Sequence, residues 1–362
     1  MNKYHSTFTL QIAAITLILS GMLTSCNNSD SLIYLKYAGY AQGTTFNIKY
    51  IKKDATSYQS EIDSILESID NSISIYNSKS IIFLANSGDT SIVLDDYFID
   101  VFQRSIEVAE RTDGAFDPTV APLVNAWGFG YKEDNTKPDS VTIDSILKFV
   151  NYKFVRLKNK KLIKTSPIHP PPSLGADLES GVGGEVTLDF NAIAQGYTVD
   201  IISGFFEKMG VENYMVELGG EIRSKGRNQN SEWWRIGIDK PIENLEEREI
   251  HAVIELKDKS LATSGNYRKF YEKNGIKYSH TIDPKTGYPV RHSLLSATII
   301  ANDCMTADAY ATAFMVMGIT KAKEFLIENP DLNLEVYFIY SGENGEWKVY
   351  YSKGFEGIIK EL

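Results

Sequence analysis

A carboxylate and a hydroxyl stand four residues apart at Asp308 and Thr312, in the run Ala-Asp-Ala-Tyr-Ala-Thr at residues 307–312. The run opens an apolar segment that predicts a helix ending near Gly318. At this spacing both oxygens lie on one helical face and can approach a single cation. With backbone carbonyls and water they form the hard ligand set that Mg²⁺ prefers. An aspartate near a helix start also acts as a cap or dipole partner, so both interpretations stay open.

The second feature is a junction at residues 188–197, where a strand pattern runs into a helix start. We expect this helix to start at Ala192, to be capped by Asn191 and to run to Gly210. Free N–H groups at a helix start bind phosphate, and the small Ala192 and Ala194 would let a ligand approach closely. A capped junction without any ligand accounts for the same residues.

The third feature is a turn punctuated by proline and glycine at residues 280–289, which begins with His280 and follows a Thr-Ser-Gly-Asn-Tyr segment at residues 263–267. An imidazole held on such a loop can serve as base or acid near pH 7. A single histidine is also often a structural hydrogen-bonding group. The turn alone does not decide between these roles.

The segments that must position these residues show both helical and strand patterns. Thr56 and Gln59 fit a capping box ahead of an apolar helical stripe, and a further helix is expected from about Asp96 to a stop at Gly114. Strand patterns occur at residues 46–50, 214–218, 233–238, 250–256 and 295–301, with a hairpin turn at Asn344-Gly345. This order of helices and strands favours an α+β fold over a regular βαβ repeat.

The N-terminal segment predicts export. It carries Lys3, no acidic residue, and an apolar stretch shorter than the roughly 20 residues that a membrane span needs, so residues 1–25 read as a signal peptide. Leu-Thr-Ser-Cys at residues 23–26 resembles a lipobox, which predicts a Cys26 carrying acyl chains such as palmitate, followed by a spacer to residue 34. An ordinary signal peptide with an incidental cysteine is the alternative. The expected location is the exported, periplasmic side of the inner membrane.

Charge and length narrow the class of protein. The formal net charge of −10 argues against nucleic acid as a partner and against a basic patch that binds anionic lipid, so the acyl chains would hold the protein to the membrane. A chain of 362 residues exceeds the common single-domain size of about 100–150, which predicts two interleaved lobes.

Six segments taken together resemble the ApbE family of FAD:protein FMN transferases. They lie in this order at residues 114–119, 189–196, 218–220, 263–265, 280–289 and 307–312. The resemblance covers nearly all of the mature chain. It implies an ApbE-like domain at residues 35–355. Within it, the Pro- and Gly-rich stretch near residues 165–185 shows little periodicity and predicts a surface insertion.

The resemblance implies an α+β fold, related to the T-fold, of two intertwined lobes with a mixed, largely antiparallel sheet and with FAD in the cleft. The implied reaction uses Mg²⁺ to pass FMN from FAD to a Thr or Ser hydroxyl of an acceptor protein, and AMP leaves. The metal positions carry over as the Ala192 carbonyl, the Asp308 carboxylate, the Ala311 carbonyl and the Thr312 hydroxyl. The FAD contacts carry over as Tyr76, Ala115, Phe116, Asp117, Asp189, Gln195 and Thr281. Tyr76 and Phe116 would stack on flat rings, and Asp117 would accept hydrogen bonds from the ligand.

His280 is the candidate base toward the acceptor hydroxyl, with Asp283 orienting it. Two positions depart from the commonest family pattern, since many members have Lys where this chain has Gln195 and Arg where it has Lys285. A glutamine cannot balance phosphate charge as a lysine would, so the cation is expected to carry more of that charge here.

Two other functions remain open from the sequence. A Mg²⁺-dependent FAD pyrophosphatase would use nearly the same residues, with water in place of the acceptor hydroxyl. A flavin-binding lipoprotein without catalysis would have no need for Asp308, Thr312 and His280 together. If the chain is a transferase, the resemblance implies that its acceptor is a subunit of a membrane redox complex, such as an NADH:quinone oxidoreductase or a related electron-transport complex.

Overall fold

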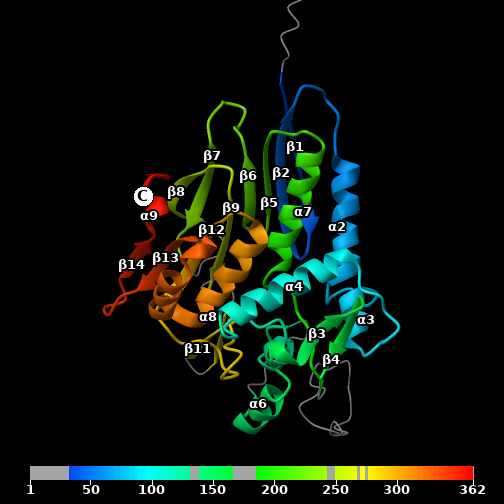
Figure 1. Ribbon diagram of the computed structural model, residues 1–362. Helices are drawn as coiled ribbons and strands as arrows, with labels where there is room; N and C mark the ends of the chain where they lie inside the picture. The colour runs from blue at the N-terminus through cyan, green and yellow to red at the C-terminus, as the bar shows by residue number, and fades with distance from the viewer. Residues whose placement is uncertain are drawn as a thin grey trace, which may run out of the picture.

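The computed structural model describes residues 32–130, 138–165, 185–242, 249–266, 270–273 and 276–361. The predicted signal peptide, Cys26 and nearly all of the predicted insertion near residues 165–185 lie outside these residues, so those predictions are not tested. The described chain enters at the upper end of the molecule in Figure 1, at the start of the first strand.

One antiparallel sheet of eight strands forms the centre of the molecule (Figure 1). In spatial order its strands are β1 (Ile33–Ala41), β2 (Thr44–Lys52), β5 (Asn213–Leu218), β6 (Glu221–Lys225), β9 (Ser260–Gly265), β12 (Leu294–Ala301), β13 (Glu335–Ser341) and β14 (Trp347–Tyr351). Each described pairing is antiparallel, which confirms the expected largely antiparallel sheet. Phe46, Ile48 and Tyr50 are buried on alternate positions, as predicted.

The described residues also form three smaller sheets. Their strands are β15 (Ile359–Glu361), β8 (Ile250–Leu256) and β7 (Trp234–Asp239) in one sheet, β10 (Phe270–Lys273) and β11 (Ile276–Ser279) in the second, and β3 (Val155–Lys158) and β4 (Lys161–Lys164) in the third. The first of these sheets packs on the central sheet through a separate hydrophobic cluster that includes Trp234, Ile254 and Tyr337. The predicted hairpin turn at Asn344-Gly345 is confirmed between β13 and β14.

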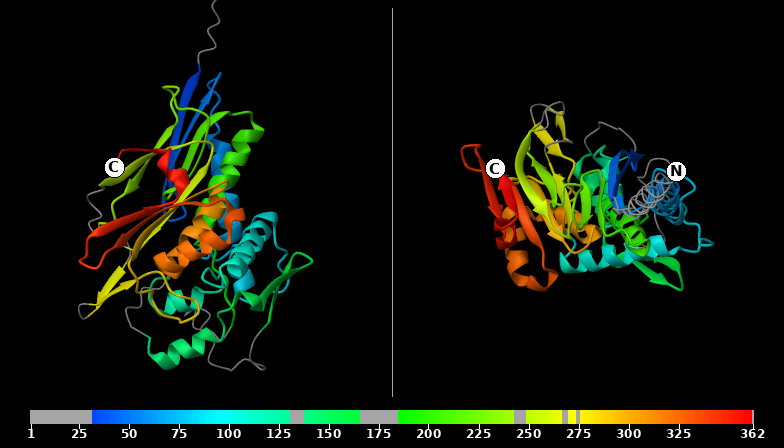
Figure 2. Two further views of the ribbon diagram at one scale, coloured as in Figure 1. Left: turned by 60° about the vertical axis from the view of Figure 1, so that its left-hand side comes forward. Right: turned by 90° about the horizontal axis from the view of Figure 1, so that it is seen from above.

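Most of the helices cover the other face of the central sheet or extend below it (Figures 1 and 2), whereas Phe355 of the short helix at residues 353–356 packs in the same cluster as Trp234 and Ile254. They are α2 (Gln59–Ile73), α3 (Ile81–Asn86), α4 (Asp96–Arg111), α5 (Ala121–Ala126), α6 (Ser140–Leu147), α7 (Ala194–Lys208), α8 (Cys304–Glu328) and α9 (Lys353–Glu356), with short 3₁₀ helices η1 (Tyr152–Phe154) and η2 (Pro330–Leu332). α7 and α8 contact each other and lie against β5, β9 and β12. The largest core lies among α4, α8 and the sheet.

The chain passes between two lobes, as its length and the family resemblance led us to expect. β2 pairs with β5, although the two strands are separated by the whole segment from α2 to α7. Within that segment α3, α5, α6, β3 and β4 build the lower part of the molecule in Figure 1. The fold therefore interleaves the sheet lobe with a lobe made from its own connection.

The predicted capping box at the first helix is wrong. α2 begins at Gln59, and the residue before it, Tyr58, makes no side-chain capping bond. The Thr56 N–H donates instead to Asp54 at 2.9 Å, while the Tyr58 N–H donates to the hydroxyl of Tyr50 on β2 at 3.0 Å. A tertiary contact to the sheet thus replaces the local cap.

The predicted start of the helix after the junction is also wrong. α7 begins at Ala194, and residues 191–193 form a turn before it. Asn191 is not the cap, because Ile193 occupies the position before the helix; the side-chain Nδ2 of Asn191 donates to Tyr76 and Asp189. The helix ends at Lys208 and not at Gly210.

The helix that carries Asp308 is longer at both ends than predicted. α8 begins at Cys304, and the side chain of Asp303 caps it by accepting from the Thr306 N–H at 2.8 Å. Asp308 therefore lies beyond the first turn, so it is not a capping residue. The helix continues to Glu328, and Gly318 marks a break in helical geometry and not its end.

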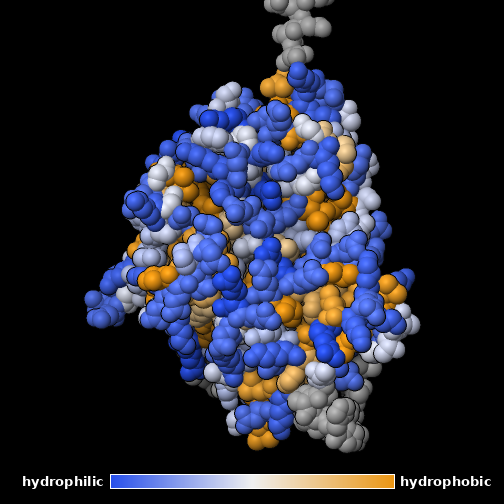
Figure 3. All heavy atoms as spheres, in the orientation of Figure 1, coloured by the Kyte–Doolittle hydropathy of each residue, from blue (hydrophilic) through white to orange (hydrophobic). Residues whose placement is uncertain are grey.

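The described helices were compared with the length and apolar character that a membrane span requires. Among the residues that the structure describes, no helix has both the length and the apolar character needed to cross a membrane. On the face in Figure 3, hydrophobic residues form separate patches between hydrophilic ones.

Candidate active site

The start of α7 meets the first half of α8 at Gly196. The Gly196 N–H donates to Oδ2 of Asp308 at 3.0 Å. A Cβ at Gly196 would lie 2.4 Å from the Cys304 carbonyl oxygen and 2.8 Å from Cβ of Asp308, so a side chain there would clash with α8. Glycine at this position lets the two helices approach closely enough to place a carboxylate at a helix start.

A second buried carboxylate lies beside this contact. Asp308 and Glu221 are each 6% exposed, and burial raises the pKa of Asp308 to about 7. Burial, followed by the charge of Asp308, raises the pKa of Glu221 as well. A Cβ built on Gly219 would lie 3.0 Å both from Oε2 of Glu221 and from the amide of Gln195, so these two side chains converge above the turn between β5 and β6.

Neither buried carboxylate has a cationic partner among the side chains that the structure describes. Among the described residues, Asp308 and Glu221 form no ion pair, and Oε2 of Glu221 is buried without a hydrogen-bond partner. Two buried carboxylates without a cation are costly, because desolvation penalises each charge and like charges repel. The arrangement is suited to a bound cation.

Thr312 continues the same helical face toward β9. Its hydroxyl lies 3.3 Å from the hydroxyl of Ser264. Just past the end of that strand, the side chain of Asn266 accepts from the Thr281 hydroxyl at 2.7 Å. The Thr-Ser-Gly segment therefore connects α8 to the turn that carries His280.

The loop at residues 114–119 is organised by Asp117. Oδ1 of Asp117 accepts from the N–H and the hydroxyl of Thr119 at 2.8 and 2.6 Å, and Oδ2 accepts from the Tyr152 N–H at 2.9 Å. Burial raises the pKa of this carboxyl, while the hydrogen bonds oppose the increase. Both oxygens thus hold the loop, and the predicted hydrogen bonds from Asp117 to FAD stay a prediction.

The same loop is joined to the junction by the backbone. The Asp189 N–H donates to the Pro118 carbonyl at 2.7 Å. Ala115 and Phe116 are buried, and the Phe116 ring packs in the largest core. Its predicted stacking on a flavin or adenine ring does not fit this burial, because the core already covers the ring.

Tyr76 is better placed for stacking. Its side chain is 64% exposed, and its hydroxyl accepts from Nδ2 of Asn191 at 3.3 Å. The same amide lies 3.3 Å from Oδ2 of Asp189, whose pKa burial raises to about 6. Asn191 therefore brings together two residues predicted separately to contact FAD.

The turn at residues 280–289 is tied to the residues that flank the loop at residues 114–119. Nζ of Lys285 pairs with Asp113, and Nε1 of Trp127 donates to the Gly287 carbonyl at 2.7 Å. Asp283 closes the turn by accepting from the Lys285 N–H at 2.9 Å, so its predicted role in orienting His280 stays a prediction. His280 is half-buried, with its ring 6.4 Å from that of Phe129.

These contacts form one closed ring. The loop at residues 114–119 bonds to the junction, the junction to α8, α8 to β9, β9 to the turn at residues 280–289, and that turn back to the residues flanking the loop. All six segments singled out in the sequence take part in the ring or, at Gly219, contact it. The carbonyls of Ala192 and Ala311 lie on these same segments, and their part in metal binding stays a prediction.

Sequence reasoning missed several residues that shape the site. Glu221 carries a signal, since it directly follows two glycines with positive φ that make the β5–β6 turn tight. Asn86 carries none, although its side chain both donates to and accepts from the backbone of Leu188, at 2.8 and 2.9 Å. Asp200 binds the N–H groups of Cys304 and Met305 and so supports the start of α8.

Comparison with known proteins agrees with the six segments. Residues 42–338 match the model of the ApbE family. The chain is 34% identical over 350 residues to the FAD:protein FMN transferase of Vibrio cholerae, covering 94% of this chain and 96% of that one. It is 35% identical over 344 residues to the enzyme of the same name from Haemophilus influenzae, covering 92% and 93% of the two chains.

The fold gives the same assignment. The solved structure of the flavin transferase ApbE from Vibrio cholerae superimposes with a TM-score of 0.77 at 32% identity, over 91% of this chain and 100% of that one. Sequence, fold and the closed ring of site segments agree, and the chain belongs to the ApbE family.

Proposed function

We propose that this protein transfers FMN from FAD to a Thr or Ser hydroxyl of an acceptor protein, with Mg²⁺ bound at Asp308, and releases AMP. The observation that carries the proposal is the buried carboxylate of Asp308 at the start of α7, beside the uncompensated Glu221. The names of the relatives support the same reaction.

The residues around Asp308 fit a magnesium ion. Among the described residues no group of three or more His, Cys, Asp and Glu side chains forms a metal site. The proposed ligands do not require one, because they are one carboxylate, the Thr312 hydroxyl and the carbonyls of Ala192 and Ala311. Such hard oxygens suit Mg²⁺, which also retains water and phosphate ligands. When bound, the ion would neutralise charge on the FAD pyrophosphate.

FAD would lie along the segments that surround this ion. The exposed ring of Tyr76 lies beside the turn before α7 and would be available for stacking. The N–H groups of Asn191, Ile193 and Ala194 in this junction are already bonded to Asp189 and Phe190, so the bound cation would be the main partner of the phosphates. Gln195 converges with Glu221 close to the proposed cation site but carries no charge. The ion would therefore balance phosphate charge without help from a cationic side chain at this position.

His280 would move the proton. Its imidazole takes the proton of the acceptor hydroxyl, the hydroxyl oxygen bonds to the FMN phosphorus, and the bond from that phosphorus to the bridging oxygen breaks. AMP leaves with the bridging oxygen. The ties from Lys285 to Asp113 and from Trp127 to Gly287 fix the turn that carries His280 beside the loop at residues 114–119.

The anchor and the acceptor are part of the proposal. A lipidated Cys26 would hold the enzyme on the periplasmic side of the inner membrane, where a membrane redox subunit would present its hydroxyl. The first described strand enters at the end of the molecule opposite α6 (Figure 1). A tether at that end leaves the loops of the lower lobe free to meet an acceptor.

The test uses the chain without its signal peptide, FAD, Mg²⁺ and a peptide that carries one threonine. The peptide should gain the mass of FMN while one equivalent of AMP appears, and EDTA should stop both. A pyrophosphatase would release free FMN and leave the peptide unlabelled, which would contradict the proposal. Asp308→Asn should abolish labelling, whereas Asp331→Asn, which removes a largely exposed carboxylate paired with Arg111, should not.

A further inference from the structure

α8 consists of two helical parts that meet at Gly318, where φ is 75° and ψ is 168°. Backbone at these angles leaves the helical path, so carbonyls in the preceding turn lose their usual intrahelical donors. The first part carries Asp308, Ala311 and Thr312, which are the proposed metal ligands on this helix. The way in which this part ends therefore affects the geometry of the metal site.

His292 satisfies one of the freed carbonyls. Its Nε2 lies 2.8 Å from the carbonyl oxygen of Met315, and its Nδ1 accepts from the Leu294 N–H at 3.3 Å. Since a carbonyl can only accept, the proton is on Nε2 and the imidazole is neutral. Burial lowers the pKa of His292, in agreement with this form.

The imidazole lies directly against the break in the helix. A Cβ at Gly318 would be 2.9 Å from Cδ2 and 3.0 Å from Cγ of His292. The missing side chain at Gly318 therefore leaves the space that the ring fills. Positive φ and this close contact both require glycine at the position.

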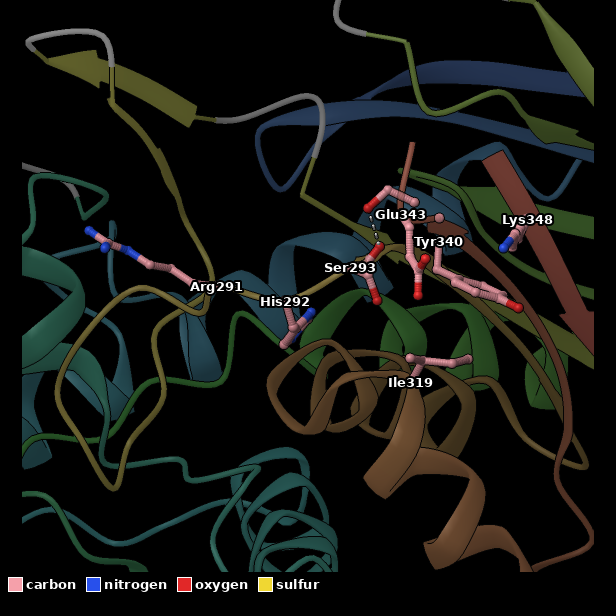
Figure 4. A pocket seen from close by; sticks show the side chains of 9 residues that line it. Arg291, His292, Ser293, Ile319, Tyr340, Glu343 and Lys348 are labelled. Atoms are coloured by element: carbon pink, nitrogen blue, oxygen red, sulfur yellow. Dashed lines mark hydrogen bonds between the residues drawn. The ribbon is translucent and has the colours of Figure 1, made fainter. Parts of the chain in front are cut away.

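The same side chain joins two parts of the ring of site segments. Met315 lies three residues after Thr312, and His292 lies near the end of the loop that begins with His280. The bond between them links the end of the metal-binding half of α8 to the loop of the proposed base. In Figure 4 the side chain of His292 lies above α8, close to Ile319, while Arg291 points away.

A cavity of about 720 Å³ opens beside this link (Figure 4). Its lining includes His292, Ile319 and Tyr340, together with Lys348 on β14. The cavity separates this side of the helix break from the turn between β13 and β14. Packing on that side is therefore open, and the bond from His292 holds the junction.

We propose that His292 is a positioning residue that sets the metal-binding half of α8 relative to the loop of His280. This inference rests on the proposed function, because it assigns the two elements their roles in flavin transfer. His292 acts through the Met315 carbonyl and touches neither FAD nor the acceptor. Small displacements of positioned groups cost about 10²-fold in rate when they misalign reacting atoms.

Two substitutions of His292 distinguish the effect of its hydrogen bond to Met315 from the effect of its ring in filling space. Glutamine places its amide nitrogen about as far from the backbone as Nε2 and can still donate to Met315. Asparagine reaches only about as far as Nδ1 and cannot. A matched control is His251→Asn, which shortens another half-buried histidine, on β8 and outside the ring of site segments.

The experiment measures kcat for peptide labelling, the dissociation constant for FAD with Mg²⁺, and hydrogen exchange of residues 309–317. His292→Asn should lower kcat at least about 10-fold, change FAD affinity less than about 2-fold and speed exchange in that segment. His292→Gln and His251→Asn should remain near the unmodified protein in kcat and in exchange of this segment.

Several results would overturn the inference. These are unchanged kcat and exchange in His292→Asn, or a folded His292→Gln that is as slow as His292→Asn. If His292→Asn does not fold, the glutamine variant decides: a kcat near that of the unmodified protein supports the inference, and a kcat at least about 10-fold lower overturns it. If the unmodified protein labels no peptide, the proposed function fails instead, and the exchange data still test whether His292 holds α8.

Discussion

The N–H of Gly196 donates to the carboxylate of Asp308 at 3.0 Å, across 112 residues of sequence. This contact places an anionic side chain at the start of a helix that the sequence marks as suited to phosphate. Under the proposed function a metal ion would be needed here, since carboxylate and phosphate would otherwise repel each other.

Gly196→Ala should lower both stability and transfer. The added Cβ would lie 2.4 Å from a backbone oxygen of α8, and overpacking of this kind typically costs about 1–3 kcal/mol. Gly204→Ala, on the same helix with no atom within 4 Å of the new Cβ, should instead be neutral or raise stability by up to about 1 kcal/mol. Urea denaturation of both variants checks this, and equal losses would exclude a specific role for Gly196.

The metal-free protein should lose stability as pH rises from about 4 to about 7. Burial raises the pKa of Asp308 to about 7, so the folded protein keeps a proton that the unfolded chain releases. The stabilising contribution is complete below the unfolded pKa near 3.8 and is lost as pH passes the folded value. A tenfold difference in proton affinity between the folded and unfolded states corresponds to about 1.4 kcal/mol of stability.

Asp308→Asn isolates this effect from the other buried carboxyls. Urea denaturation in EDTA at pH 5 and pH 8 should show a smaller difference for the variant than for the unmodified protein. Adding Mg²⁺ at pH 8 should stabilise the unmodified protein and leave the variant unchanged. Identical pH dependence in the two proteins would show that Asp308 is not the buried acid responsible.

His280→Ala should slow labelling by about 10² to 10⁴ while FAD still binds in the presence of Mg²⁺. The reason is that a general base lowers the barrier to transfer without contributing to binding of the nucleotide. Fluorescence titration of FAD and mass spectrometry of the peptide should be run on one preparation. Loss of binding with normal turnover of bound FAD would make His280 a ligand and not a base.

Cys26→Ala should release the protein from the membrane or leave it as an uncleaved precursor, because the acyl chains are the proposed attachment. Labelling with a radioactive fatty acid, followed by separation of membrane and soluble fractions, checks this. Equal labelling of the variant and the unmodified protein would exclude Cys26 as the lipidated residue.

Local patterns in the sequence determined the elements and the six site segments. Alternation at β2 and the apolar stripe of α4 arise within a few residues, so burial on one face can be read directly. Asn344-Gly345 likewise carries its own turn geometry. The family resemblance added the reaction and the candidate ligands.

The sequence predicted the wrong start for α2 and α7, and in both cases the residues near the start bind groups that are distant in the sequence. Asn191 turns to Tyr76, 115 residues away, and not to the helix that follows it. The Tyr58 N–H finds a hydroxyl on the sheet. Local sequence cannot indicate such partners, because they come near only after the chain has packed.

Only the tertiary structure decided which polar groups meet. The sequence does not indicate that Glu221 interacts with Asp308, because the two carboxylates meet only when β6 is in place. Asn86 likewise binds the backbone of Leu188, which is 102 residues away. His292 likewise acquires its role from the break at Gly318, which frees the Met315 carbonyl. Side-chain type and local spacing are properties of the sequence, whereas burial and the meeting of distant polar groups are set by packing, and these produce the charge and hydrogen bonding of the site.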